Sequence, residues 1–193
     1  MYNTDMKRLY ILAGANGSGK STIAAAILPA EKISYINADD IAKELCPSDL
    51  NSVKIKAGKI FFDRTEECFK KQQSFAIEST LSGLGHIKTI KKAQSFGYSV
   101  VIAYVFVDSP QVCINRIKAR VKNGGHHVPD ADVIRRYARS RHNFINAYSK
   151  LADCWALYYN GGGEILLVAA QTKGYEVNVF SNELYLNFRG NNA

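Results

Sequence analysis

The sequence predicts a three-layer, doubly wound α/β domain, in which helices cover both faces of a mainly parallel sheet. Short apolar runs rich in β-branched and aromatic residues alternate with longer segments of helical period. The run at 98–107 (YSVVIAYVFV) is almost continuously apolar, which is typical of a strand buried on both faces. The 193 residues suffice for one domain whose core needs no disulfide or structural metal. We therefore predict a single domain over residues 1–193.

The first half of the chain begins with a buried strand at 9–13, followed by a glycine-rich turn and a helix at about 19–28. A second strand is predicted at 33–36, and a further helix begins near Ile41. A long helix follows, because apolar or small residues recur on one helical face. These residues are Val53, Ala57, Ile60, Phe61, Thr65 and Cys68.

The second half continues with strands at 75–77 and 98–107. A helix at 109–122 begins at Ser109-Pro110, a favourable N-cap followed by proline. Residues 123–129 (NGGHHVP) interrupt the helical pattern. The next helix is marked by Ile134, Tyr137, Phe144, Ile145 and Tyr148. A strand at 155–159 then precedes a β-hairpin at about 164–181, which predicts an antiparallel edge of the sheet.

The charge balance favours anionic partners. Lys and Arg number 25 against 17 Asp and Glu, a net charge of +8, which suits nucleotides, phosphorylated small molecules, nucleic acid or an acidic protein. No apolar run reaches the ~18–20 residues of a membrane span, and the apolar run near the N-terminus is too short for a signal peptide. The four cysteines form no CxxC pair. We expect a cytoplasmic protein with reduced thiols and no membrane partner.

The strongest motif is a phosphate-binding loop. Residues 14–21 (GANGSGKS) match GxxxxGK[ST] between a predicted strand and a predicted helix. In this motif backbone N–H groups surround phosphates, the lysine bridges the β- and γ-phosphates, and the hydroxyl of Ser21 binds Mg²⁺. We therefore expect ATP and Mg²⁺ as cofactors. The expected nucleotide-binding residues are Gly14, Ala15, Asn16, Gly17, Ser18, Gly19, Lys20, Ser21 and Thr22.

Acidic residues follow three of the predicted strands, at the edge of the sheet where ligands bind in doubly wound folds. Asp39 or Asp40 is a candidate general base for a substrate hydroxyl, or alternatively the N-cap of the following helix. Glu78, with Thr80 beside it, could bind Mg²⁺ through water or hold a substrate hydroxyl. Asp108 could be a metal-binding acid, although capping of the next helix is the favoured interpretation.

An arginine-rich segment, at about 116–141, is predicted to be a lid. It contains eight Lys or Arg against two Asp, a net charge of +6. Arg116 and Arg120 share one helix face, and the glycine turn allows the chain to return with Arg136 toward the same phosphates. Guanidinium groups there could neutralise the transferring phosphoryl group and exclude water. We do not expect a nucleic-acid patch, since aromatic residues are not interleaved with these arginines.

These motifs together resemble those of the zeta-toxin family of small P-loop kinases. GANGSGKST, YINADDIA, FAIESTLSG and the helix–GGHHVP–helix segment with VIRRY occur in the family's order, over roughly residues 8–160. The chain is most similar to the small branch with GGHxVP. The resemblance implies a P-loop NTPase fold of the kinase type with an arginine-rich lid.

The resemblance also implies a function and roles for residues. It implies ATP-dependent phosphorylation of a hydroxyl on a nucleotide-activated sugar such as UDP-N-acetylglucosamine, at the sugar's 3′-hydroxyl, and, by analogy, an antitoxin protein as partner. Carried over by position, Asp39 matches the catalytic base, and Glu78 and Thr80 match the substrate-contacting pair. Lys20 matches the phosphate-loop lysine, and the lid arginines match Arg116 or Arg120 and Arg136. We expect Lys20, Arg120 and Arg136 as catalytic residues and Arg116 as a nucleotide-binding residue.

Two alternatives remain open at this point. One is a kinase for the hydroxyl of another nucleoside, nucleotide or antibiotic. The other is an ATP-dependent switch or nucleic-acid-binding protein whose basic segment holds phosphates. The latter predicts an oligonucleotide affinity that falls steeply with salt.

Overall fold

In the computed structural model, seven strands form one sheet in the order β2-β3-β1-β4-β5-β6-β7. The structure describes residues 6–28, 33–50 and 52–190. The strands are β1 (Arg8–Ala13), β2 (Ser34–Ile36), β3 (Phe75–Ser79), β4 (Ser99–Phe106), β5 (Cys154–Tyr159), β6 (Leu166–Thr172) and β7 (Asn178–Val179). The first five strands are parallel, whereas β6 and β7 pair antiparallel at one edge. The mainly parallel sheet with an antiparallel C-terminal edge is confirmed.

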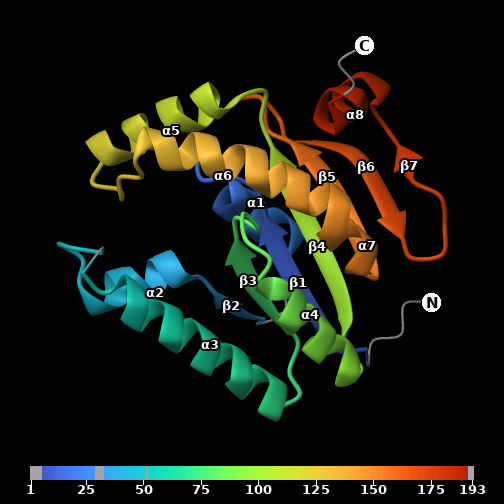
Figure 1. The fold of residues 1–193 in the computed structure, drawn as a ribbon, viewed down its shortest axis with the longest axis horizontal. Helices are drawn as coiled ribbons and strands as arrows, with labels where there is room; N and C mark the ends of the chain where they lie inside the picture. Colours follow the sequence, from blue (N-terminus) through green and yellow to red (C-terminus); the bar gives the residue numbers. More distant parts are fainter. Residues whose placement is uncertain (1–5, 29–32, 51, 191–193) are drawn as a thin grey trace.

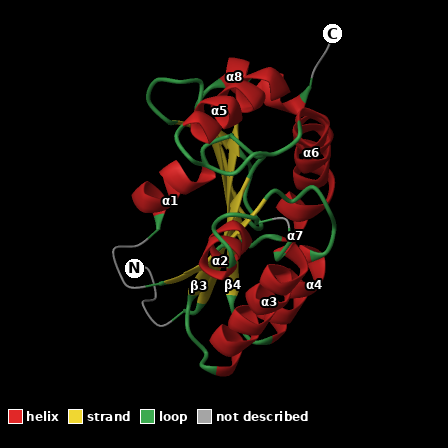
Figure 2. Ribbon diagram, turned by 90° about the vertical axis from the view of Figure 1, so that its left-hand side faces the viewer, coloured by secondary structure: helices red, strands yellow, loops and turns green. Residues whose placement is uncertain are grey.

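Helices lie on both faces of the sheet (Figures 1 and 2). They are α1 (Lys20–Ile27), α2 (Ala38–Leu45), α3 (Lys54–Lys70), α4 (His86–Ser95), α5 (Pro110–Lys122), α6 (Asp130–Asn143), α7 (Ser149–Leu151) and α8 (Asn182–Arg189). Figure 2 shows α1 on one side of the sheet and α3, α4 and α6 on the other. The predicted three-layer arrangement is therefore confirmed.

The core follows the alternation of the strands. On β1, Leu9 and Ile11 face the larger cluster, which includes Phe61 of α3 and Phe188 of α8. Leu12 faces the opposite side and packs with Ala24 of α1. Because successive strand residues point to opposite faces, an unbroken apolar strand requires helices on both sides.

The sheet register places three loops at one edge. Ala13 at the end of β1 pairs with Ser79 of β3 and with Tyr104 of β4. The segment after β1 thus lies between the residues that follow β3 and those that follow β4. The candidate site lies at this edge.

Some helices differ from the prediction. The sequence predicted neither α4 nor α8, and α2 begins at Ala38 rather than near Ile41. Ile134, expected on the apolar face of α6, is exposed, and Val133 takes the buried position. The last part of this helical segment is a π-helix, η1 (Phe144–Tyr148).

Within the residues that the structure describes, no helix is both long and apolar enough to span a membrane. The four cysteines, Cys46, Cys68, Cys113 and Cys154, are free thiols.

Candidate active site

The phosphate loop, residues 14–19, joins β1 to α1. Gly14 has a φ of +138°, and a Cβ there would lie 2.2 Å from the carbonyl oxygen of Val105. Gly19 has a φ of +98°, and a Cβ there would lie 2.1 Å from Nδ2 of Asn160. Both positions require glycine, because a side chain would be strained and would collide with these atoms. The loop leads directly into the N-terminus of α1. The positive end of the helix dipole lies there and attracts phosphate.

Asn160, directly after β5, holds this loop. Its Nδ2 donates to the carbonyl oxygen of Ser18 at 3.0 Å, and its backbone N–H donates to Phe106 at 2.9 Å. Arg116 in turn donates to the carbonyl oxygen of Asn160 at 2.9 Å. Asn160 thus connects the loop to β4 and α5. No sequence motif marks Asn160, so this residue was not among the predicted site residues.

Lys20, the first residue of α1 after the phosphate loop, lies beside Glu78. The Lys20 side chain is only 6% exposed, and its Nζ donates to the carbonyl oxygen of Ala15 at 3.0 Å. The same Nζ lies 3.7 Å from Oε1 of Glu78, whose other oxygen accepts from the Ser21 hydroxyl at 3.0 Å. The structure therefore brings together Lys20, Ser21 and Glu78, from distant parts of the sequence.

Tyr35 of β2 is a further member of this cluster that sequence reasoning missed. Its hydroxyl donates to Oε2 of Glu78, the oxygen that also accepts from Ser21. Burial and the Glu78 carboxylate raise the pKa of Tyr35, so its hydroxyl stays a donor at neutral pH. Tyr35 therefore fixes the direction of the Glu78 carboxylate.

Asp39 occupies the second position of α2. The N-cap of this helix is Asn37, whose Oδ1 accepts from the backbone N–H of Asp39 at 2.9 Å. The alternative that Asp39 or Asp40 caps the helix is therefore wrong. Asp40 instead forms an exposed ion pair with Lys43 at 3.0 Å. The Asp39 side chain is left facing the space in front of the phosphate loop.

Asp108 and Thr80, the other two candidates that follow strands, have different hydrogen-bond partners. Asp108 accepts from the hydroxyl of Tyr159 at 2.9 Å, and Ser109 caps α5 by accepting from the N–H of Val112. The interpretation of Asp108 as the cap is thus wrong, whereas the predicted cap at Ser109 is confirmed. Thr80 shares a hydrogen bond with the hydroxyl of Ser82 at 2.9 Å and lines a cavity with Glu78.

The lid segment forms α5, a loop at 123–129, and α6. Arg116 and Arg120 of α5 face the phosphate loop across a cavity. Arg136 of α6 donates to Oδ1 of Asn16 at 3.3 Å and lies 3.6 Å from Asp132. Arg120 donates to the carbonyl oxygen of His126 at 2.8 Å, which ties the loop to α5.

The remaining cations of this segment face elsewhere. Lys118 pairs with Asp130 and Arg135 pairs with Asp132 on the surface, while Arg141 donates to the carbonyl oxygen of Asn187. Arg139 is exposed. Net charge alone could not separate these residues from the three arginines that line the cavities.

Three cavities meet at Asn16 and Asp39. The phosphate-loop cavity, about 450 Å³, lies between Lys20, Arg116 and Gly162. The inner cavity, about 280 Å³, lies between Glu78, Thr80 and Phe62. The lid cavity, about 720 Å³, lies between α2, the start of α3 and the lid loop. Asp39 lines all three cavities, so it is the point at which ligands in them would meet.

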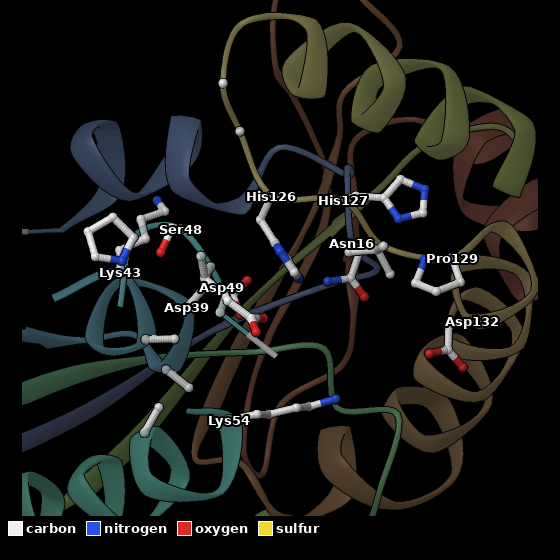
Figure 3. A pocket seen from close by; sticks show the side chains of 18 of the residues that line it. Asn16, Asp39, Lys43, Ser48, Asp49, Lys54, His126, His127, Pro129 and Asp132 are labelled. Atoms are coloured by element: carbon white, nitrogen blue, oxygen red, sulfur yellow. The ribbon is translucent and has the colours of Figure 1, made fainter. Parts of the chain in front are cut away.

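Figure 3 shows the lid cavity. The side chain of His126 points toward Asp39, whereas that of His127 points away from it, and Lys54 reaches toward the cavity from α3. Burial lowers the pKa of His126 below its ordinary value, although the Asp39 carboxylate opposes this shift. His126 thus presents a largely neutral ring at pH 7, and the cavity contains both cations, Lys43 and Lys54, and carboxylates, Asp39, Asp49 and Asp132.

Comparison with known proteins identifies the family. The family model described as "Zeta toxin" matches residues 3–167. The chain belongs to the zeta toxin family. This confirms the resemblance drawn from the four motifs and the predicted P-loop kinase fold, and the matched range includes the phosphate loop, Asp39, Glu78 and residues 116–141.

The chain is also similar to individual proteins and solved structures. A protein of Haemophilus influenzae, described as uncharacterized, is 36% identical over 124 residues, which are 64% of this chain and 88% of that protein. A chain of the AvrRxo1-ORF1:AvrRxo1-ORF2 complex with sulphate ions has a TM-score of 0.78 and 19% identity, covering 96% of this chain. This chain spans about 64% of the length of that neighbour.

A second structural neighbour comes from the PezAT chromosomal toxin–antitoxin system of Streptococcus pneumoniae. Its TM-score is 0.66 and its identity 18%, over 97% of this chain and 80% of that one. At these identities the two structural neighbours bear on the fold alone.

Proposed function

We propose that this protein transfers the γ-phosphate of ATP to a hydroxyl of a small molecule, and that the acceptor is a UDP-N-acetyl sugar. The observation that carries the proposal is the position of Asp39. It lines the phosphate-loop cavity and both cavities beyond it. A nucleotide on one side and an acceptor on the other would therefore meet at its carboxylate.

The phosphate-loop cavity suits a triphosphate. The loop and the N-terminus of α1 supply N–H groups and positive potential, and Lys20, Arg116 and Arg120 add fixed cations. A structure of the AvrRxo1 complex is described as containing ATP. We propose the nucleotide-binding roles of residues 14–22 and of Arg116 on this basis.

The oxygen donors beside the loop suit Mg²⁺. The hydroxyl of Ser21 and the carboxylate of Glu78 lie together, and Mg²⁺ prefers such ligands with several waters. When bound with ATP, the ion would neutralise charge on the phosphate oxygens. Ser21 is the proposed direct ligand, and Glu78 would hold a water or an acceptor hydroxyl.

The inner and lid cavities suit a bipartite acceptor. The inner cavity is large enough for one sugar ring, and Thr80 and Glu78 offer hydrogen-bonding groups. The adjoining lid cavity is larger, and Lys43, Lys54 and Arg136 line it together with Asp39, Asp49 and Asp132. Its cations suit a diphosphate. This division supports a nucleotide-linked sugar.

In the proposed reaction, Asp39 accepts the proton of the acceptor hydroxyl. The hydroxyl oxygen forms a bond to the γ-phosphorus, and the bond from the γ-phosphorus to the bridging oxygen of ADP breaks. ADP leaves with the electron pair of that bond. Lys20, Arg120 and Arg136 would stabilise the negative charge on the transferring group.

A labelling experiment tests this function. The protein is incubated with Mg²⁺, ATP labelled at the γ-phosphate, and a pool of UDP-sugars, nucleosides, an antibiotic set and oligonucleotides. We expect the label in a UDP-N-acetyl sugar. Label in another acceptor would support kinase activity but would show that a UDP-N-acetyl sugar is not the acceptor.

The location and partner are also proposals. We propose that the protein acts in the cytoplasm, on cytoplasmic ATP and nucleotide sugar. By analogy with the PezAT system we propose an antitoxin protein as partner, expected to suppress the transfer reaction when the two are mixed.

Lysine replacement of the lid arginines tests their role. Arg120→Lys and Arg136→Lys should each lower kcat by about 10-fold or more, while the Kd for ATP changes less. Lysine keeps the charge but loses the planar fork that matches phosphoryl oxygens. Arg139→Lys, in an exposed residue of α6, is the matched control. If turnover equals that of the control, Arg120 and Arg136 contribute only surface charge and have no role in phosphoryl transfer.

The hydrogen bond from Tyr35 gives a separate prediction. Tyr35→Phe removes one donor from Glu78 and should raise the Mg²⁺ concentration needed for half-maximal activity several-fold, because the carboxylate loses its fixed direction. Tyr10→Phe on β1 is the control. An unchanged Mg²⁺ requirement would show that Tyr35 does not position Glu78.

A further inference from the structure

The lid loop, residues 123–129, is joined to Arg120 by three hydrogen bonds. The backbone N–H groups of Asn123 and Gly125 both donate to the carbonyl oxygen of Arg120, each at 3.0 Å. In the other direction, Nη2 of Arg120 donates to the carbonyl oxygen of His126 at 2.8 Å. The loop therefore holds both the backbone and the guanidinium group of this arginine.

Gly125 leaves the space through which the Arg120 side chain passes. A Cβ at residue 125 would lie 2.4 Å from Cγ and 3.1 Å from Cδ of Arg120, and 2.9 Å from its carbonyl oxygen. Carbon atoms in ordinary contact are about 3.5–4.0 Å apart, so the Arg120 side chain would have to move by about 1 Å.

The two glycines of the loop differ in the reason for which glycine is needed. Gly124 has a φ of +80°, which serves the turn between α5 and α6, and a Cβ there would meet no heavy atom within 4 Å. The φ of Gly125 is not positive, so backbone strain gives no reason for glycine at this position. The reason at Gly125 is the path of the Arg120 side chain.

Arg120 gains most from such support because it is exposed, although it lines the phosphate-loop cavity. A free arginine side chain loses rotamer entropy when it is fixed against a ligand. Arg136 has a carboxylate partner on its own helix, Asp132, at 3.6 Å. The His126 carbonyl is neutral, so it orients the fork of N–H donors of Arg120 without cancelling the charge.

We propose that Gly125 and His126 are positioning residues for phosphoryl transfer, because they set the direction of Arg120. Gly125 gives the side chain its path, and the backbone carbonyl of His126 holds the guanidinium group beside the phosphate-loop cavity. This inference rests on the proposed kinase function and deepens it, since it states what places one of the charges that would stabilise the transferring group.

A double-mutant cycle tests whether Gly125 acts through Arg120. Gly125→Ala, Arg120→Ala and the double variant are compared with wild-type protein. The kcat for transfer from ATP to UDP-N-acetylglucosamine and the Kd for ATP are measured for each. Gly85→Ala is the matched control, because the φ of Gly85 is −58° and a Cβ there would meet no heavy atom within 4 Å.

We expect Gly125→Ala to lower kcat by about 10- to 100-fold, because a displacement of about 1 Å from the reactive geometry can have such an effect. The Kd for ATP should change by less than about threefold, since the lost interaction acts in the transition state. In the Arg120→Ala background the same substitution should lower kcat by less than about twofold, because the colliding side chain is absent. Gly85→Ala should keep the wild-type kcat.

The outcomes separate this inference from the proposed function. If wild-type protein transfers phosphate but Gly125→Ala has the wild-type kcat, the positioning role alone is overturned. Equal losses from Gly125→Ala with and without the Arg120 side chain would overturn it as well, because the substitution would then act on the loop itself. If wild-type protein transfers phosphate to no acceptor, the kinase function fails and the positioning role fails with it.

A measurement on wild-type protein does not depend on whether a variant folds. Without ligand, the hydrogen bond from Nη2 to His126 should slow the rotation of the Arg120 guanidinium group. Arginine-selective NMR should therefore show separate Nη signals for Arg120, assigned by their loss in Arg120→Lys. Exposed Arg139 should give averaged signals. Averaged signals for Arg120 too would show that the loop does not hold its guanidinium group, and would overturn the proposal.

Discussion

Replacing Lys20 by alanine is expected to lower phosphoryl transfer by about 10²-fold or more. The Lys20 ammonium is 6% exposed and lies between the phosphate loop and Glu78, so it is positioned before any ligand arrives. A preorganised cation in such a site stabilises charge that develops in the transition state. Initial rates with saturating ATP and acceptor measure this effect.

Lys118→Ala is the matched control for this loss. Lys118 forms a surface ion pair with Asp130, and such pairs contribute only ~0–1 kcal/mol to stability. The control should retain wild-type turnover. A Lys20→Ala protein that folds and turns over at the wild-type rate would show that the phosphate loop does not hold the reacting nucleotide.

Replacing Asp39 by asparagine should abolish most transfer while keeping the fold. A positioned general base contributes ~10²–10⁴-fold in rate. Asparagine is nearly isosteric, and the backbone N–H of residue 39 still donates to Asn37. Only the favourable interaction of a carboxylate with the first turn is lost, about 0.3–1 kcal/mol. The melting temperature and the ATP affinity should therefore change little, and kcat reports the loss.

Asp40→Asn separates this role from a general effect of charge. Asp40 pairs with Lys43 on the surface, so its loss costs no more than an exposed ion pair. We expect this variant to remain active. If Asp40→Asn is inactive and Asp39→Asn is active, the two roles are reversed. If both variants are active, neither carboxylate on α2 is the general base.

The sequence predicted the elements whose signals are local. The strand before the phosphate loop, helix α5 with its Ser109 cap, and the buried face of α3 follow from periodicity and capping. Helix α4 lacks an acidic residue in its first turn and a side-chain cap, and so gave no start signal. Helix α8 was missed although its signals are local: Ser181 stands at the N-cap, Glu183 lies in the first turn, and Gly190 ends the helix with a positive φ.

In the site, too, local sequence signals located some residues, whereas contacts between distant parts of the chain could not be predicted. The motif located Lys20 and Ser21, and the strand-end rule located Glu78 and Asp39. Their contacts depend on register instead: Tyr35 reaches Glu78 because β2 lies beside β3, with Tyr35 opposite Ala76. Asn160 reaches Ser18 across 142 residues of sequence. The cap at Asn37 was missed because the helix was expected to begin near Ile41, which put the aspartates at the cap position, whereas α2 begins at Ala38. Asparagine and aspartate cap a helix about equally well, so residue type alone could not decide between them.

The most direct measurement is the identity and position of the phosphate on the product. Purified protein is incubated with Mg²⁺, ATP and UDP-N-acetylglucosamine, and the product is analysed by mass spectrometry and phosphorus NMR, with Asp39→Asn as the inactive reference. We expect one added phosphate on the 3′-hydroxyl of the sugar and one ADP for each product molecule. ATP turnover that leaves the sugar unmodified and releases only inorganic phosphate would contradict the proposed transfer.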